Sequence, residues 1–228
     1  MQSPIILALD VEDIKEALSY VDELFEYIDI FKVGPVLFIK YGRKIVDEIK
    51  SRGKNVFLDL KLHDIPNTVR LALESIIELR VDFVTLHLSG GRNMIREAVK
   101  VAKDTETKLL GVTVLTSITD DDLTEMGIRS SVPHLVRNLA KIGIEENIDG
   151  IVCSPMEIKI VRELSENTII VTPGIRMRED SLQDQKRVMT PQEAINQGAN
   201  FIVMGRSLLE EKDRIGKIKR ILEGVRFT

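Results

Sequence analysis

Cysteine is nearly missing from this chain of 228 residues: Cys153 is the only one, so no internal disulfide can form. A single thiol is typical of a protein that works in a reducing compartment. No apolar run approaches the roughly 20 residues that span a bilayer. The N-terminal MQSPIILALD has no basic segment leading into a long apolar stretch. We therefore expect a cytoplasmic protein without a membrane segment or a secretory leader.

Positive charge is slightly outnumbered by negative charge, with 32 Lys and Arg residues against 36 Asp and Glu. The formal net charge is -4 and the pI is about 5.6, which argues against a nucleic-acid partner and against an anionic membrane surface. A small anionic substrate is still compatible with these values, because a local group of lysines and arginines can bind it. The expected partner is a small molecule.

Short apolar runs alternate with longer amphipathic stretches along the whole chain, which predicts repeated strand–helix units. With 43% hydrophobic residues, residues 1–228 are expected to form a single domain. The first apolar run is followed by Asp10-Val11-Glu12 without a glycine, which disfavours a dinucleotide-binding sheet. Eight units instead predict the α/β class and a single (β/α)8 TIM barrel. The strands are expected at Ile5–Leu9, Ile30–Val33, Val56–Leu60, Phe83–Leu86, Leu109–Val114, Gly150–Val152, Ile169–Val171 and Phe201–Met204.

Helical periodicity fills the stretches between these strands. Two segments lack it, Thr116–Ser131 and Gly174–Thr190, and both follow a predicted strand. They should therefore lie at the C-terminal mouth of the barrel, where barrel enzymes keep their chemistry. The second segment is long, polar and charged, which is typical of a lid. The helices are expected at Asp13–Tyr27, Val36–Ser51, Val69–Leu79, Met94–Lys103, Val132–Ile144, Met156–Leu164, Gln192–Gln197 and Ser207–Leu222.

Charged residues stand in or just after the first three predicted strands, although barrel interiors are usually filled by branched apolar side chains. Asp10 ends the first strand and Lys32 lies in the second. Asp59 and Lys61 belong to the third, where a spacing of two places both on one face. Asp64 follows in the next loop. The alternating set in this stretch is Lys32, Asp59, Lys61 and Asp64. A lysine held between carboxylates stays protonated, so the set suits proton donation better than Schiff-base chemistry.

Each of these residues also has a structural interpretation. Asp10 is a residue type that caps helices. The structural interpretation of Lys32 is an ordinary surface lysine. The structural interpretation of Asp59 and Lys61 is an ion pair that only stabilises the barrel mouth.

The three histidines do not predict a metal centre. His87 follows the fourth strand, where a histidine more often satisfies a backbone group than performs chemistry. His63 and His134 show no metal-ligand spacing with it or with Cys153. We expect no bound metal.

A second group of candidates follows the last two predicted strands, where barrel enzymes often bind phosphate. Pro173-Gly174-Ile175-Arg176 comes after the seventh strand, and Gly205-Arg206-Ser207 after the eighth, with Gln185 in the predicted lid. Glycine allows backbone N–H groups to approach an oxyanion, and an arginine offers a fork of donors. The structural alternative is a glycine turn followed by the first residue of a helix.

The segment DLKLHDIPNTV (Asp59–Val69) closely resembles the orotidine 5′-phosphate decarboxylases. The resemblance implies a decarboxylase that needs no metal or cofactor and converts orotidine 5′-monophosphate to uridine 5′-monophosphate, the last step of de novo UMP synthesis. Leu88, where a smaller residue is common in that family, is a minor departure. The other matching motifs occur in the family's order: LALD (Leu7–Asp10), FKVG (Phe31–Gly34), HLSGG (His87–Gly91), VTVLTS (Val112–Ser117), TPGIR (Thr172–Arg176), DQKRVMTP (Asp184–Pro191) and GRSL (Gly205–Leu208).

The same resemblance implies a role for each charged candidate. Lys61 would protonate C6 of the pyrimidine after carbon dioxide leaves. Asp59 would sit against the substrate carboxylate and disfavour the charged ground state. Lys32 would join the charged network and contact the ribose, and Asp10 would bind the ribose hydroxyls.

The resemblance also implies a homodimer with shared active sites. Asp64 and Thr68 would reach into the neighbouring subunit's site. The remaining substrate-binding candidates are Thr116 and Ser117 at the pyrimidine, Gln185 between base and phosphate, and Arg206 at the phosphate, together with Pro173 and Gly205.

Two other functions fit parts of this pattern. Mg²⁺-dependent relatives on the same barrel, such as hexulose-phosphate synthases and keto-gulonate-phosphate decarboxylases, share an Asp-x-Lys-x-x-Asp pattern on the third strand. They place a glutamate ligand on the second strand, where this chain has Lys32, a cation that would repel the metal. A non-catalytic nucleotide-phosphate binder is the other alternative. The presence of Lys61 with both neighbouring carboxylates disfavours it.

Overall fold

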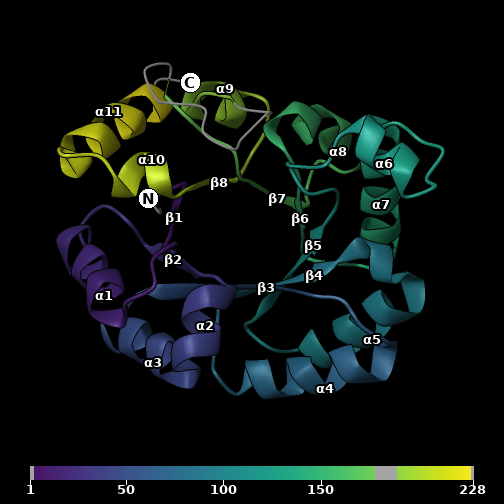
Figure 1. Cartoon of the computed structure of the whole chain (residues 1–228), viewed down its shortest axis with the longest axis horizontal. Helices are drawn as coiled ribbons and strands as arrows, with labels where there is room; N and C mark the ends of the chain where they lie inside the picture. The colour runs from purple at the N-terminus through teal and green to yellow at the C-terminus, as the bar shows by residue number, and fades with distance from the viewer. Residues whose placement is uncertain (1–2, 178–188, 227–228) are drawn as a thin grey trace.

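The computed structural model describes residues 3–177 and 189–226. Its strands form one closed parallel barrel in chain order, and β8 pairs back to β1. Figure 1 shows the helices as a ring around these strands. The predicted (β/α)8 fold is confirmed. The strands are β1 (Ile5–Ala8), β2 (Ile30–Val33), β3 (Asn55–Leu62), β4 (Phe83–His87), β5 (Lys108–Val112), β6 (Gly150–Val152), β7 (Ile169–Thr172) and β8 (Phe201–Met204).

The helices occupy the predicted stretches, but two of the predicted helices are divided. The segment Val36–Ser51 breaks at Gly42, whose φ of 54° ends one helix before the next begins. The segment Ser207–Leu222 likewise consists of a single short turn and a longer helix. The observed helices are α1 (Ile14–Glu23), α2 (Pro35–Tyr41), α3 (Arg43–Ser51), α4 (Pro66–Ile77), α5 (Arg92–Ala102), α6 (Asp120–Glu125), α7 (Val132–Glu145), α8 (Ile158–Leu164), α9 (Pro191–Asn196), α10 (Arg206–Leu209) and α11 (Arg214–Arg226), with 3-10 turns at Leu88–Gly90 and Pro155–Glu157.

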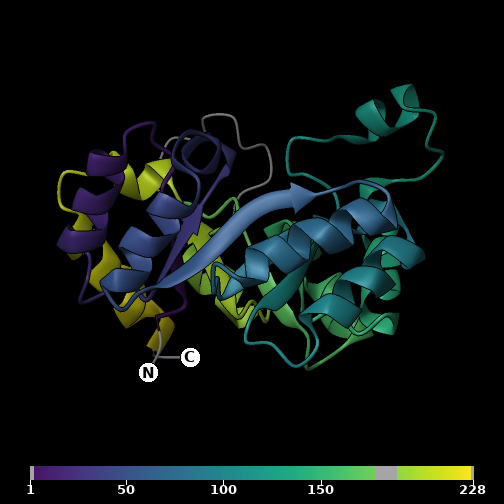
Figure 2. The ribbon, with the colours of Figure 1, turned by 90° about the horizontal axis from the view of Figure 1, so that it is seen from below.

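The first aperiodic segment contains a helix that periodicity could not reveal, because α6 has only six residues. Thr119 begins it with a capping box: its hydroxyl accepts from the backbone N–H of Asp122, and the Asp122 carboxylate accepts from the N–H of Thr119. Figure 2 shows this segment standing away from the ring of helices. Most of the second segment, which is the predicted lid, lies outside the described residues, and so does Gln185.

Alternation along the strands divides the core into two layers. One set of strand residues faces the barrel axis, and the other packs against the helices. Burial of each large apolar side chain contributes about 1.5–3 kcal/mol, so both layers stabilise the ring. The interior set is Ile6, Ala8, Ile30, Phe57, Phe83, Leu110, Val171 and Val203.

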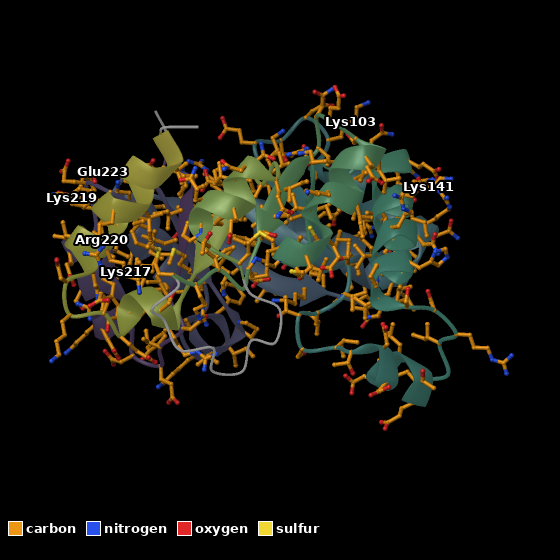
Figure 3. The ribbon with its side chains drawn as sticks, turned by 90° about the horizontal axis from the view of Figure 1, so that it is seen from above. Lys103, Lys141, Lys217, Lys219, Arg220 and Glu223 are labelled. Carbon is orange, nitrogen blue, oxygen red and sulfur yellow. The ribbon has the colours of Figure 1, made fainter. Side chains whose placement is uncertain are left out.

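The outer surface is charged. Figure 3 shows Lys141 on α7 and Lys219 and Glu223 on α11 at this surface, and all three are exposed. Lys217, also on α11, is only 2% exposed and donates to the backbone oxygen of Ser207 at 2.9 Å. This contact fastens α11 to α10. In the part of the chain that the structure describes, no helix is both long and apolar enough to cross a lipid bilayer.

Candidate active site

The charged residues at the mouth of the barrel continue the interior face of their strands. Asp10, Lys32 and Asp59 each follow an interior apolar residue by two positions, so alternation turns them toward the same axis. Below them the barrel is filled by apolar side chains. The polar residues therefore form a layer on top of the core, at the carboxyl ends of the strands.

This layer is a row of alternating charges. The Lys32 ammonium lies 3.3 Å from Asp10 Oδ1 and 3.5 Å from Asp59 Oδ2. The Lys61 ammonium donates to both oxygens of Asp59, at 2.8 and 2.9 Å. The fold thus brings Lys32, Asp59 and Lys61 of the predicted alternating set together with Asp10. Asp64, the fourth member of that set, does not line the same cavity.

Mutual attraction keeps this row ionised. Burial alone would lower the pKa of Lys32, but the negative charges of Asp59 and Asp10 outweigh it and raise the pKa. Burial alone would raise the pKa of Asp59, but Lys32 and Lys61, with hydrogen bonds from Lys61 and Thr85, hold it below its usual value. At neutral pH the site therefore presents fixed charges of both signs.

Thr85 is a site component that sequence analysis missed. It lies in β4 and is 1% exposed, and its hydroxyl donates to Asp59 Oδ1 at 2.9 Å. Analysis of strand ends overlooked it because it lies in the middle of its strand. The available signal was a polar residue two positions after the interior residue Phe83.

The four residues of the charge row line a cavity of about 320 Å³ that opens at the mouth. Arg176 also lines it and is 7% exposed, although the predicted substrate-binding set did not include it. Nine of the twelve predicted site residues line this cavity: Asp10, Lys32, Asp59, Lys61, Thr116, Ser117, Pro173, Gly205 and Arg206.

The backbone after β8 approaches β1 closely. A Cβ atom at Gly205 would lie 3.0 Å from Asp10 Oδ2, closer than nearly all such contacts in proteins. A larger residue there would push the Asp10 carboxylate away from its position beside Lys32. Glycine thus allows Arg206, the next residue, to follow the strand without disturbing the charge row.

Asp64 and Thr68 are not part of the cavity of their own chain. Both are exposed, and Asp64 accepts a hydrogen bond from the N–H of Ile65 at 2.7 Å. Ile65 itself is 67% exposed despite being a large apolar residue. The segment after β3 therefore points polar and apolar side chains away from its own barrel.

His87 ends β4 and is half-buried. Its ring centroid is 5.4 Å from that of His63. Burial lowers the pKa of His87, and the nearby His63 and Lys61 lower it further against the attraction of Asp59. Among residues 3–177 and 189–226, no group of three or more His, Cys, Asp or Glu side chains is arranged to hold a metal ion.

Comparison with known proteins identifies the family. The sequence model of the orotidine 5′-phosphate decarboxylase / HUMPS family matches residues 3–221. This chain belongs to that family. Its members include an orotidine 5′-phosphate decarboxylase of Carboxydothermus hydrogenoformans, which is 43% identical over 98% of this chain and 96% of its own length. Another from Methylacidiphilum infernorum is 44% identical over 95% of each chain.

The family relationship extends to three dimensions. The crystal structure of orotidine 5′-phosphate decarboxylase from Lactobacillus acidophilus is similar to this chain with a TM-score of 0.82 and 32% identity. The match covers 98% of this chain and 99% of the other. The barrel and the position of its mouth are therefore shared with a solved member of the family.

Proposed function

We propose that this protein decarboxylates orotidine 5′-monophosphate to uridine 5′-monophosphate in pyrimidine biosynthesis. The observation that carries the proposal is the row of Asp10, Lys32, Asp59 and Lys61, with the Lys61 ammonium within 2.8 and 2.9 Å of both Asp59 oxygens. Such a row offers a negative group to disfavour a substrate carboxylate and a proton donor beside it. Relatives with this activity in their names match nearly the whole chain.

In the proposed reaction the bond between C6 and the carboxylate carbon breaks, and its electron pair stays on C6. Asp59 faces the carboxylate that is lost, so the repulsion between them disappears as carbon dioxide leaves. The Lys61 ammonium gives one proton to C6 and becomes a neutral amine, which then takes a proton from water. Fixed charges supply the stabilisation and need no rearrangement during the step.

The rest of the cavity is proposed to bind the nucleotide. Asp10 binds the ribose hydroxyls, and Lys32 contacts the ribose. Arg206 and Gly205 receive the phosphate after β8, and Arg176, which lines the same cavity, adds a second cation. Three predicted contacts complete the set: Thr116 and Ser117 at the pyrimidine, and Pro173 beside the predicted lid, in which Gln185 would join base and phosphate.

The proposed active unit is a homodimer with shared sites. The outward direction of Asp64 and Thr68 supports it, because neither side chain reaches the cavity of its own chain. The 67% exposure of Ile65 between them also supports it, since burial of a large apolar side chain against a second subunit is favourable. We also propose that residues 1–228 form a single domain in the cytoplasm. The one closed barrel of the described residues supports a single domain, and the lone thiol of Cys153 supports a reducing compartment.

Mixing two inactive variants tests the shared site. Asp59→Ala damages a site from within, and Asp64→Ala damages the neighbour's site. A mixed dimer then contains one site with both lesions and one with neither, so about half of the mixed dimers' normal capacity should return. Absence of recovery, with subunit exchange verified by mass spectrometry, would show that Asp64 serves its own chain or none.

The decisive test of the activity is loss of orotidine 5′-monophosphate absorbance with purified protein, with and without excess EDTA. We expect loss of substrate, appearance of uridine 5′-monophosphate, and no effect of the chelator. A folded protein that leaves the substrate unchanged would overturn the proposed function. Activity that EDTA abolishes would instead favour Mg²⁺-dependent chemistry of the kind found elsewhere on this barrel.

A further inference from the structure

The pairing register between strands β3 and β4 shifts next to the charge row. Leu58 pairs with Val84, and the next paired residues are Leu62 and Leu86. Three residues of β3 therefore face a single residue of β4, which is Thr85. Such a bulge bends a strand and redirects its side chains.

Lys61 is the residue that this irregularity places in an unusual conformation. Its φ is 50°, in the left-handed region that residues with a Cβ atom seldom adopt. Its backbone N–H donates to the Thr85 hydroxyl at 2.9 Å. Surrounding contacts must hold this conformation, because the residue itself disfavours it.

The Thr85 hydroxyl makes two different hydrogen bonds. An N–H can only donate, so the hydroxyl accepts from Lys61. Its single hydrogen is then available to Asp59 Oδ1, 2.9 Å away. The buried Thr85 hydroxyl thus connects the backbone of Lys61 to the Asp59 carboxylate. The Lys61 ammonium contacts the same carboxylate.

We infer that Thr85 is a positioning residue for the decarboxylation. It does not line the cavity and acts through Lys61 and Asp59. Its hydroxyl holds Lys61 in the left-handed conformation and fixes the carboxylate against which the ammonium rests. Without the hydroxyl, Lys61 relaxes toward ordinary strand geometry, and its ammonium no longer returns to one place relative to C6. The kinetic part of this inference rests on the proposed function.

Three substitutions at this position test the inference. Thr85→Val removes the hydroxyl and keeps the branched shape, and kcat should fall by up to about 100-fold, as a displacement of about 1 Å in a reacting group does. Binding of uridine 5′-monophosphate should change by less than about threefold, because Gly205 and Arg206, which are proposed to hold the phosphate after β8, are unaltered. Thr85→Ser keeps the hydroxyl and should retain a kcat near that of the wild type. Should Thr85→Val fail to fold, Thr85→Cys, with a weakly hydrogen-bonding thiol, carries the same expectation.

Thr107→Val is the matched control. Thr107 is 4% exposed, and its hydroxyl donates to the backbone oxygen of Val81 at 2.7 Å, at the opposite end of the barrel. Removing that hydroxyl should lower the melting temperature and leave kcat unchanged. Equal kcat in Thr85→Val and the wild type would overturn the inference, as would a Thr85→Ser variant as slow as Thr85→Val.

A structural readout separates this inference from the proposed function. The crystal structure of Thr85→Val should show Lys61 outside the left-handed region, or its ammonium displaced from Asp59. Unchanged Lys61 geometry in that variant would overturn the inference whatever the enzyme's reaction. A wild-type protein inactive on orotidine 5′-monophosphate would overturn the proposed function and leave this geometric test standing.

Discussion

Asp59→Asn should destabilise the protein far more than loss of an ordinary surface carboxylate. The substitution keeps the shape of the side chain and removes the negative charge between the ammonium groups of Lys32 and Lys61. The Asp59 and Lys32 side chains are only 11% and 12% exposed. Removing one partner of a buried ion pair costs about 3–5 kcal/mol. The 34% exposure of the Lys61 side chain allows it to turn toward water, so we expect about 3 kcal/mol, at the low end of that range.

Asp47→Asn provides the matched control. Asp47 pairs with Arg43 at 3.1 Å on α3, and these side chains are 56% and 63% exposed. An exposed pair of this spacing contributes about 0.3–0.5 kcal/mol. Urea unfolding at pH 7, followed by circular dichroism, gives the free energy of unfolding for both variants and the wild type. The melting temperature of Asp59→Asn should fall by about 6–12 °C, since each kcal/mol is worth about 2–4 °C at this chain length.

The pH dependence of the Asp59→Asn effect distinguishes charge from shape. Because folding lowers the pKa of Asp59, its contribution is fully present above the unfolded value of about 3.9. It is lost as the pH falls through the lower folded value. The difference from the wild type should therefore stay constant from pH 7 to pH 5 and shrink below about pH 3.9. A difference that came from shape alone would not change with pH. A difference no larger than that of Asp47→Asn would refute the reasoning, because the two ammonium groups would then gain nothing from the carboxylate.

Four further variants test other parts of the molecule. Lys61→Ala should keep uridine 5′-monophosphate binding and lose at least about 100-fold in kcat; substantial turnover in stopped assays would argue against its role as proton donor. Arg206→Ala should weaken calorimetric binding of uridine 5′-monophosphate by about 1.5–3 kcal/mol and leave uridine binding unchanged; equal losses for both ligands would place the phosphate elsewhere. His87→Asn should reduce the loss of stability in urea as the pH falls below about 6.5, because the lowered folded pKa makes protonation favour unfolding; identical pH profiles would contradict this. Gly150→Ala should cost about 1–3 kcal/mol, since its Cβ would lie 2.8 Å from the backbone oxygen of Ile169; an unchanged melting temperature would mean that the strand moves freely.

Periodicity predicted the barrel because its core is built from alternation and repetition. Strands β2, β6 and β8 begin and end at the predicted residues. The predictions of helices failed where local backbone chemistry, rather than hydrophobic periodicity, determines the structure. Gly42 divides a helix that the apolar pattern carries through, and α6 depends on a cap too short to show a period.

Three members of the charge row were predictable for the same reason, but the predicted set contained Asp64 where the row contains Asp10. The precise geometry of the row was not predictable. A spacing of two residues places Asp59 and Lys61 on one face of an ideal strand. The bulge and the left-handed φ of Lys61 depend on how β3 meets β4, which is a relation between segments distant in sequence. Thr85 escaped attention because its importance arises only from that pairing.

Closure of the ring between β8 and β1 has a consequence for synthesis of the protein. These strands come from opposite ends of the described chain. One edge of β1 therefore stays unpaired during synthesis until β8 has been made. Asp10 and Arg206 flank this seam, so a nucleotide bound to both bridges the first and last units and favours the closed ring by mass action. Recovery of uridine 5′-monophosphate binding during refolding, followed by stopped-flow fluorescence with a labelled nucleotide, would then time the docking of the final strand. Uridine 5′-monophosphate, the proposed product, would then stabilise the closed barrel of the enzyme that makes it.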